Sequence, residues 1–160
     1  MVGLGELAVD SGNFREAQNW LESGLLPIHE IGERRFLVAG LTCLGAAVWE
    51  SGDAVTARNC FREAFTLALE MRATPLSLSC LTRLIELLRE KDLVEKGFAV
   101  EILALVMRHP AVWQEVKVRA ERSIAGLQKE MPPAIFSLAL ERRQTAFLND
   151  LVTEGLEYRI

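Results

Sequence analysis

The sequence has few of the residues from which metal and disulfide sites are built. Its 160 residues include only two histidines and three cysteines. The cysteines, Cys43, Cys60 and Cys80, are odd in number and contain no C-x-x-C pair, so neither a disulfide framework nor a zinc site is predicted. We expect them to be small buried helix residues.

Motifs of catalysis and nucleotide binding are also missing. The sequence has no H-E-x-x-H, no G-x-S-x-G, no glycine-rich phosphate loop and no dinucleotide fingerprint. His29 follows the end of a predicted helix and His109 precedes Pro110, so both are interpreted as loop or cap residues. Carboxylates such as Glu86 and Glu90 are spaced as on solvated helix faces. We therefore expect a chain that is not an enzyme and that needs no cofactor and no metal.

Positive charge is in short supply. Lys and Arg number 18 against 22 Asp and Glu, which gives a net charge of −4 at pH 7. The composition does not indicate the basic patch of a phosphate-binding protein, and we expect no direct contact with nucleic acid. The longest uncharged run, 36–49, is too short to span a bilayer, and the N-terminus has no signal-peptide pattern. These observations predict a cytoplasmic protein without membrane contact.

What the sequence does have is the composition of a helical protein. Half of its residues are hydrophobic and 25% are charged, while aromatic residues make up only 7%. Leu and Ala, both strong helix formers, dominate the hydrophobic residues. No segment alternates like a half-buried strand. The length corresponds to about one domain, so we expect one continuous all-α domain.

An offset of 40 residues recurs when the chain is aligned with itself. The matching pairs are Leu4 and Leu44, Gly5 and Gly45, Gly12 and Gly52, Ala17 and Ala57, Leu21 and Phe61, and Leu25 and Phe65. A third copy follows more loosely. Repeats of this length indicate stacked supersecondary units that share a core. We expect three helix pairs over about 1–30, 31–73 and 74–108, followed by C-terminal capping helices over 109–160.

Small residues in the second unit predict how its two helices pack. Gly45 on the first helix and Ala57 and Ala64 on the second would let the backbones approach closely, with Phe61 filling the space between them.

Turn and cap residues predict where the helices begin and end. Gly52 suits the left-handed position after a helix, and Asp53 can cap the next helix. Asp92 and Glu95 are spaced as in a capping box. The predicted helices are near 2–11, 14–26, 33–50, 54–72, 75–90, 93–108, 111–130, 133–144 and 146–158.

The repeat pattern resembles the tetratricopeptide repeat. The residues that carry the resemblance are Leu44, Gly45, Gly52, Ala57, Phe61 and Ala64, with Leu4, Gly5, Gly12, Ala17, Leu21 and Gly24 in the preceding copy. The consensus repeat has 34 residues; the longer period here is similar to that of the tetratricopeptide arms of bacterial STAND-type NTPase regulators. This resemblance implies an α-α superhelical solenoid that binds proteins, and an NTPase or signalling domain ahead of it.

Two further features bear on the same comparison. The tail segments His109-Pro110, Trp113-Gln114, Pro132-Pro133 and 147–152 look like the closing segment of such arms. Met1 falls inside what should be the first helix of the first repeat. Either the chain is a fragment of a longer protein, or a partner surface completes the stack; the open apolar face then predicts a homodimer through residues 1–26 or exchange of an end helix.

The repeat register predicts a concave groove lined by the first helix of each pair. The lining positions are Val2, Glu6, Val9 and Asp10, then Thr42, Ala46, Trp49 and Glu50, then Thr82, Glu86, Arg89 and Glu90. This lining is mostly acidic with one aromatic residue, so the expected partner is a basic or neutral peptide or helix. Trp49 is the sharpest candidate for contact with a partner; the alternative is that it packs against a neighbouring helix. Trp20 is expected to pack between repeats, and Trp113, with Val112 and Val116, to anchor the seventh predicted helix.

A second function stays open at this point. The repeats could enclose a small apolar effector, and an enclosed apolar pocket near Trp49 and Ala46 would favour that function, whereas an open acidic trough would favour a peptide.

Overall fold

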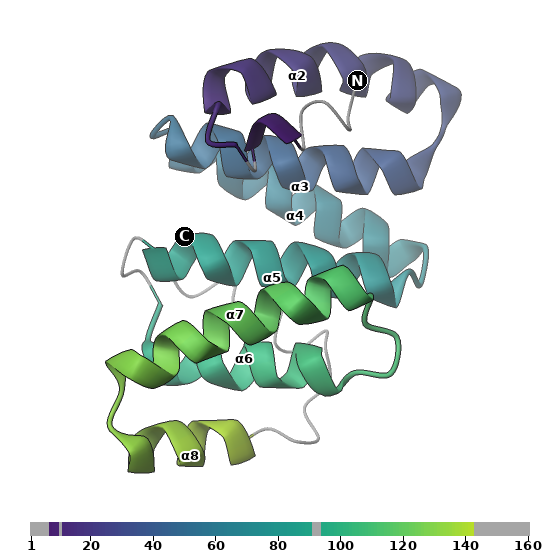
Figure 1. Ribbon diagram of the computed structural model, residues 1–160. Helices are drawn as coiled ribbons and strands as arrows, with labels where there is room; N and C mark the ends of the chain where they lie inside the picture. Colours follow the sequence, from purple (N-terminus) through teal and green to yellow (C-terminus); the bar gives the residue numbers. More distant parts are fainter. Residues whose placement is uncertain (1–6, 10, 91–93, 143–160) are drawn as a thin grey trace. The chain divides into compact units, whose positions relative to one another are not determined.

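The computed structural model describes residues 7–9, 11–90 and 94–142, with the backbone alone for 26–31 and 90. After a helical turn at 7–9, its helices are α2 (Phe14–Ile31), α3 (Arg34–Glu50), α4 (Ala54–Glu70), α5 (Thr74–Glu90), α6 (Lys96–Arg108), α7 (Gln114–Glu130) and α8 (Pro133–Glu141) (Figure 1). No strand occurs in these residues, and the all-α prediction is confirmed. The helix predicted over 146–158 and most of the one over 2–11 lie outside the described residues.

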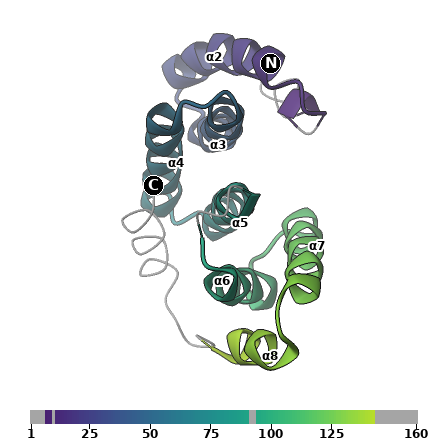
Figure 2. The ribbon, with the colours of Figure 1, turned by 90° about the vertical axis from the view of Figure 1, so that its left-hand side faces the viewer.

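The helices belong to two compact units, one up to Cys80 and one from Leu81 onward, so that the division falls inside α5. In the first unit α3 contacts both α2 and α4, and in the second α6 contacts both α7 and α8. Figure 2 shows α3 and α6 each flanked by their two neighbours. The division does not coincide with the repeat boundaries that the sequence predicts at 73 and 108.

The turn between α3 and α4 is formed as predicted. Gly52 has a φ of +93°, a left-handed conformation that favours glycine. Asp53 stands at the N-cap of α4, where one carboxylate oxygen accepts a hydrogen bond from the Thr56 backbone N–H at 3.0 Å. The other carboxylate oxygen accepts from the Thr56 hydroxyl at 2.6 Å. These bonds satisfy a backbone donor that the helix leaves unpaired.

Three predicted helix ends are wrong. α2 was predicted to stop before Pro27 but continues to Ile31, and the chain turns only at Gly32, whose φ is +77°. α6 begins at Lys96, so Glu95 is the N-cap of this helix and does not occupy the N3 position that a capping box starting at Asp92 would require. α7 begins at Gln114 and not near 111, because 109–112 form a turn.

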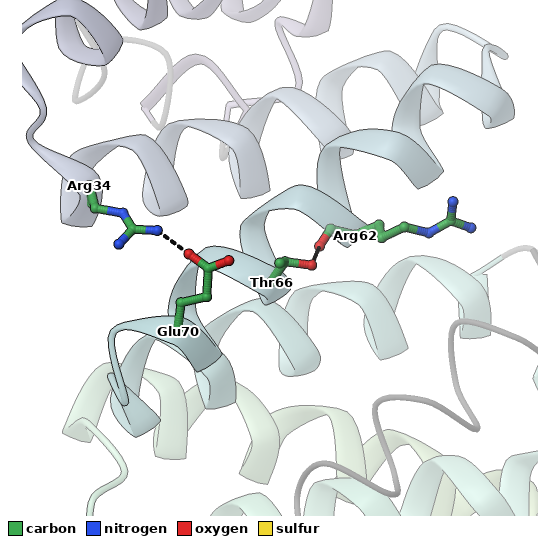
Figure 3. A network of polar contacts seen from close by, with 4 residues as sticks. All are labelled: Arg34, Arg62, Thr66 and Glu70. Atoms are coloured by element: carbon green, nitrogen blue, oxygen red, sulfur yellow. Dashed lines mark hydrogen bonds and ion pairs between the residues drawn. The ribbon is translucent and has the colours of Figure 1, made fainter.

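The nesting of α3 and α4 agrees with the prediction made from the small residues. Ala57, Phe61 and Ala64 are all fully buried, and Gly45 faces the Phe61 ring. The far end of the pair is tied by an ion pair between Arg34, the first residue of α3, and Glu70, the last residue of α4 (Figure 3). Figure 3 also shows the Thr66 hydroxyl, which donates to the Arg62 carbonyl one turn back on α4 at 2.9 Å.

No helix in the described part of the chain combines the length and the apolar character that crossing a bilayer requires.

Candidate interaction surface

Four residues of the predicted groove are in the protein interior. Thr42, Ala46 and Trp49 on α3 and Thr82 on α5 are all buried, with only 6% of Trp49 exposed. The Thr42 hydroxyl donates to the Val38 carbonyl at 2.8 Å. The prediction assumed that α3 keeps one open face. Instead nearly every residue from Leu37 to Trp49 is buried, as in a helix that is apolar all round. These four side chains therefore line no open surface, and Trp49 is a packing residue.

Two more predicted groove residues are turned toward α7. The Glu86 carboxylate accepts a hydrogen bond from the Ser123 hydroxyl at 3.0 Å and lies 3.6 Å from the Arg119 guanidinium. Arg89 lies 3.7 Å from the Glu130 carboxylate. Both residues are only partly exposed. Glu86 and Arg89, which were predicted to face a partner, thus form their charged contacts with residues of α7.

The remaining predicted positions divide into three groups. Val2, Glu6 and Asp10 lie outside the described residues, as does the side chain of Glu90. Val9 is buried. Glu50, at the end of α3, is partly exposed and lines a surface depression.

This depression has a volume of about 650 Å³ and lies in the first unit. Its lining residues come from the start of α2, the turn before it and the end of α3: Gly12, Asn13, Phe14, Arg15, Glu16, Asn19, Glu50 and Ser51. α2 and α3 run antiparallel, which brings the first turns of one beside the last turn of the other (Figure 1). We call this feature the α2/α3 depression.

The α2/α3 depression combines carboxylates with aromatic surface. Glu16 and Glu50 contribute two acids, and Arg15 is the one cation among the described lining residues. Phe14 is half-buried. One turn along α2, the Trp20 indole N–H donates to the Glu16 carboxylate at 3.4 Å, and 37% of Trp20 is exposed. Trp20, which was predicted to pack between repeats, is thus partly open to solvent. This combination suits a basic or neutral segment with apolar side chains.

Of the residues that line this depression, the predicted groove contained Glu50 alone. Most of the others lie at the start of the helix predicted over 14–26, and the pairing of that start with Glu50, far along the chain, depends on how α2 and α3 pack. Trp113, which was expected to anchor the seventh helix, stands at the N-cap of α7 and is 41% exposed.

The cysteines are buried helix residues, as predicted. Burial raises the pKa of the Cys80 thiol to about 12, although a hydrogen bond with Thr42 acts in the opposite direction. Burial, with Glu63 nearby, raises the pKa of the Cys60 thiol to about 11. Because the thiolate is the reactive form, these two thiols are poor nucleophiles in the folded protein. Within the described residues, no three His, Cys, Asp or Glu side chains gather closely enough to hold a metal ion.

Comparison of the chain with protein-family models, with curated proteins and with solved structures finds no match.

Proposed function

We propose that this chain is a non-catalytic protein-interaction module that binds a basic or neutral peptide or helix at the α2/α3 depression. In this proposal the helix pairs are tetratricopeptide-like repeats of a solenoid. The resemblance noted in the sequence supports a role as the sensor or assembly arm of a bacterial signalling or transcriptional regulator, in the cytoplasm.

The observation that carries the proposal is the placement of two carboxylates beside exposed aromatic surface. Glu16 and Glu50 come from different helices and line the same depression as Phe14. A lysine or arginine of a partner gains from both carboxylates, while its apolar side chains cover Phe14 and the exposed part of Trp20. The helices hold these side chains in place before the partner arrives, which lowers the entropic cost of binding.

The depression favours a peptide over a small apolar effector. Most of its lining residues are polar or charged, and it is open to solvent. The effector alternative required an enclosed apolar pocket at Ala46 and Trp49, and these two side chains are packed in the interior.

A binding titration tests the proposal. The probe is a fluorescently labelled amphipathic helical peptide of leucine and lysine, and its counterpart of leucine and glutamate serves as the charge control. We expect the lysine peptide alone to bind, with an affinity that falls as salt rises. In the double variant Glu16→Gln/Glu50→Gln the affinity should fall roughly tenfold, which is about 1.4 kcal/mol.

The matched control is Glu121→Gln, which removes an exposed carboxylate from α7 in the other unit. The affinity should not change in this variant. If Glu121→Gln weakens binding as much per charge as the double variant does, the attraction comes from net charge alone and the proposal is wrong. Failure of the native chain to bind the lysine peptide contradicts it as well.

A further inference from the structure

Trp20 and Glu16 form a hydrogen-bonded pair on the surface of α2. Residues four apart lie one turn along the same face of a helix, and the Trp20 indole N–H donates to Glu16 Oε1 at 3.4 Å. Glu16 is exposed, as is 37% of Trp20, so a partner can reach both side chains. Because Glu16 lines the α2/α3 depression, the hydrogen bond places the indole at the edge of that depression. We call these two residues the Trp20/Glu16 pair.

The hydrogen bond leaves binding capacity on both members of the pair. It uses the N–H at the edge of the indole ring and one carboxylate oxygen, so neither the ring faces nor Glu16 Oε2 takes part in it. Within the part of the chain that the structure describes, no cation is paired with Glu16. Arg15 is its neighbour in sequence, but adjacent residues on a helix do not face each other. The pair can therefore accept a cation from outside the chain.

The chemistry of the pair favours a guanidinium over an ammonium. A cation above an indole face is attracted by the negative charge of the π-system, and tryptophan gives the strongest such attraction among the aromatic residues. The guanidinium of arginine is planar and weakly hydrated, so it can stack on the ring and also donate to a carboxylate through its fork of N–H groups. The ammonium of lysine is a strongly hydrated point charge and does not stack in this way.

We propose that the Trp20/Glu16 pair is an arginine subsite at the edge of the α2/α3 depression, where a partner's guanidinium stacks on the indole and donates to the Glu16 carboxylate. Trp20 then makes the site prefer arginine to lysine, while Glu16 and Glu50 attract either cation. The partner's apolar side chains cover Phe14 and the rest of the indole. This inference rests on the proposed function and narrows its partner to a segment that carries arginine.

A double-mutant cycle tests the subsite. The labelled peptide of leucine and lysine is compared with the same peptide in which arginine replaces every lysine. Both are titrated against the native full chain and against Trp20→Leu, which keeps an apolar side chain but removes the π-system, below the concentration at which light scattering detects a dimer. We expect the native chain to bind the arginine peptide roughly fivefold more tightly than the lysine peptide, and Trp20→Leu to bind the two about equally.

The matched control is Trp113→Leu, which removes a comparably exposed indole, 41% exposed, from the second unit. It should keep the full preference for arginine. Circular dichroism of each variant measures whether the helices persist. Trp20→Phe is a second variant that keeps an aromatic face without the indole N–H, and its preference for arginine should fall to about twofold.

The outcomes separate the subsite from the proposed function. Equal affinity of the native chain for the two peptides overturns the subsite and leaves the proposed function standing. A preference for arginine that persists in full in Trp20→Leu and Trp20→Phe also overturns the subsite, because the carboxylates then discriminate without the indole. Failure of both peptides to bind the native chain contradicts the proposed function and the subsite together.

Discussion

The ring of Phe61 lies directly against the backbone of Gly45. A Cβ atom at position 45 would be 3.0 Å from Phe61 Cε2 and 3.3 Å from the Ala57 carbonyl oxygen. Phe61 and Ala57 are fully buried, and a buried ring has little room to withdraw. Glycine at 45 is thus what allows α3 and α4 to nest at this distance.

Gly45→Ala should destabilise the protein by about 1 to 3 kcal/mol, because the added methyl group overpacks this contact. The control is Gly126→Ala on α7, where a Cβ atom would meet only Arg89 Nη1 at an ordinary 3.5 Å. There the better helix propensity of alanine should stabilise the protein by up to about 1 kcal/mol. Urea unfolding of the two variants measures both effects. Equal effects of the two substitutions would mean that the Phe61 contact does not limit the packing.

Ser77→Ala should stabilise the protein by roughly 1 kcal/mol. The Ser77 hydroxyl is buried on α5 and has no hydrogen-bond partner among the residues that the structure describes. The matched control is Ser123→Ala, which removes the hydroxyl that donates to Glu86 and should destabilise the protein by about 1 kcal/mol. The unfolding temperatures of both variants, compared with that of the native chain, measure these effects. A loss of stability in Ser77→Ala would show that the Ser77 hydroxyl is hydrogen-bonded.

The Asp53 cap should make stability depend on pH. Its hydrogen bonds with Thr56 lower the pKa of the Asp53 carboxyl from its ordinary value. A carboxyl whose pKa is lower in the folded protein contributes stability above the pKa of the unfolded chain and loses it as the pH falls through the folded pKa. Asp53→Asn keeps a capping side chain without the charge.

The difference in unfolding free energy between the native chain and Asp53→Asn should therefore stay constant from pH 7 to about pH 5. Below about pH 4 it should shift in favour of the variant. Urea unfolding across this range measures the difference, and a difference that is flat down to pH 2 contradicts the capping role of the carboxylate.

A homodimer through residues 1–26 stays a prediction from the sequence. In that segment Leu7 is 66% exposed and Trp20 is 37% exposed. We expect the mass measured by light scattering to rise toward a dimer with concentration, and Trp20→Ser to lower it. Trp113→Ser, which removes a comparably exposed indole from the second unit, should have no effect. A monomer at every concentration would rule the dimer out.

Local features of the fold could be predicted from the sequence because their physical causes are local or repeat along the chain. Gly52 and Asp53 form a turn and cap from their own backbone and side-chain chemistry. Gly45, Ala57 and Phe61 could be predicted to lie in contact, because two small residues and one large aromatic residue allow neighbouring helices to approach closely.

The predicted groove failed because lining a surface depends on what lies opposite. Trp49 has the spacing of a groove residue, but nearly every residue of α3 from Leu37 to Trp49 is buried. Glu86 and Arg89 have the spacing of a solvated face, but α7 lies against them. The uncharged run 36–49 does indicate a buried α3, which conflicts with a groove lined by that helix. The position of α7, in contrast, cannot be derived from the residues of α5 alone.

The most direct test of the interaction proposal is to map the bound peptide by NMR. Backbone amide resonances of the full chain are recorded with and without the leucine and lysine peptide. The account predicts chemical-shift changes concentrated at residues 12–19 and 50–51, which diminish in Glu16→Gln/Glu50→Gln. Changes concentrated instead on α6, α7 or α8, with none at these residues, would contradict it.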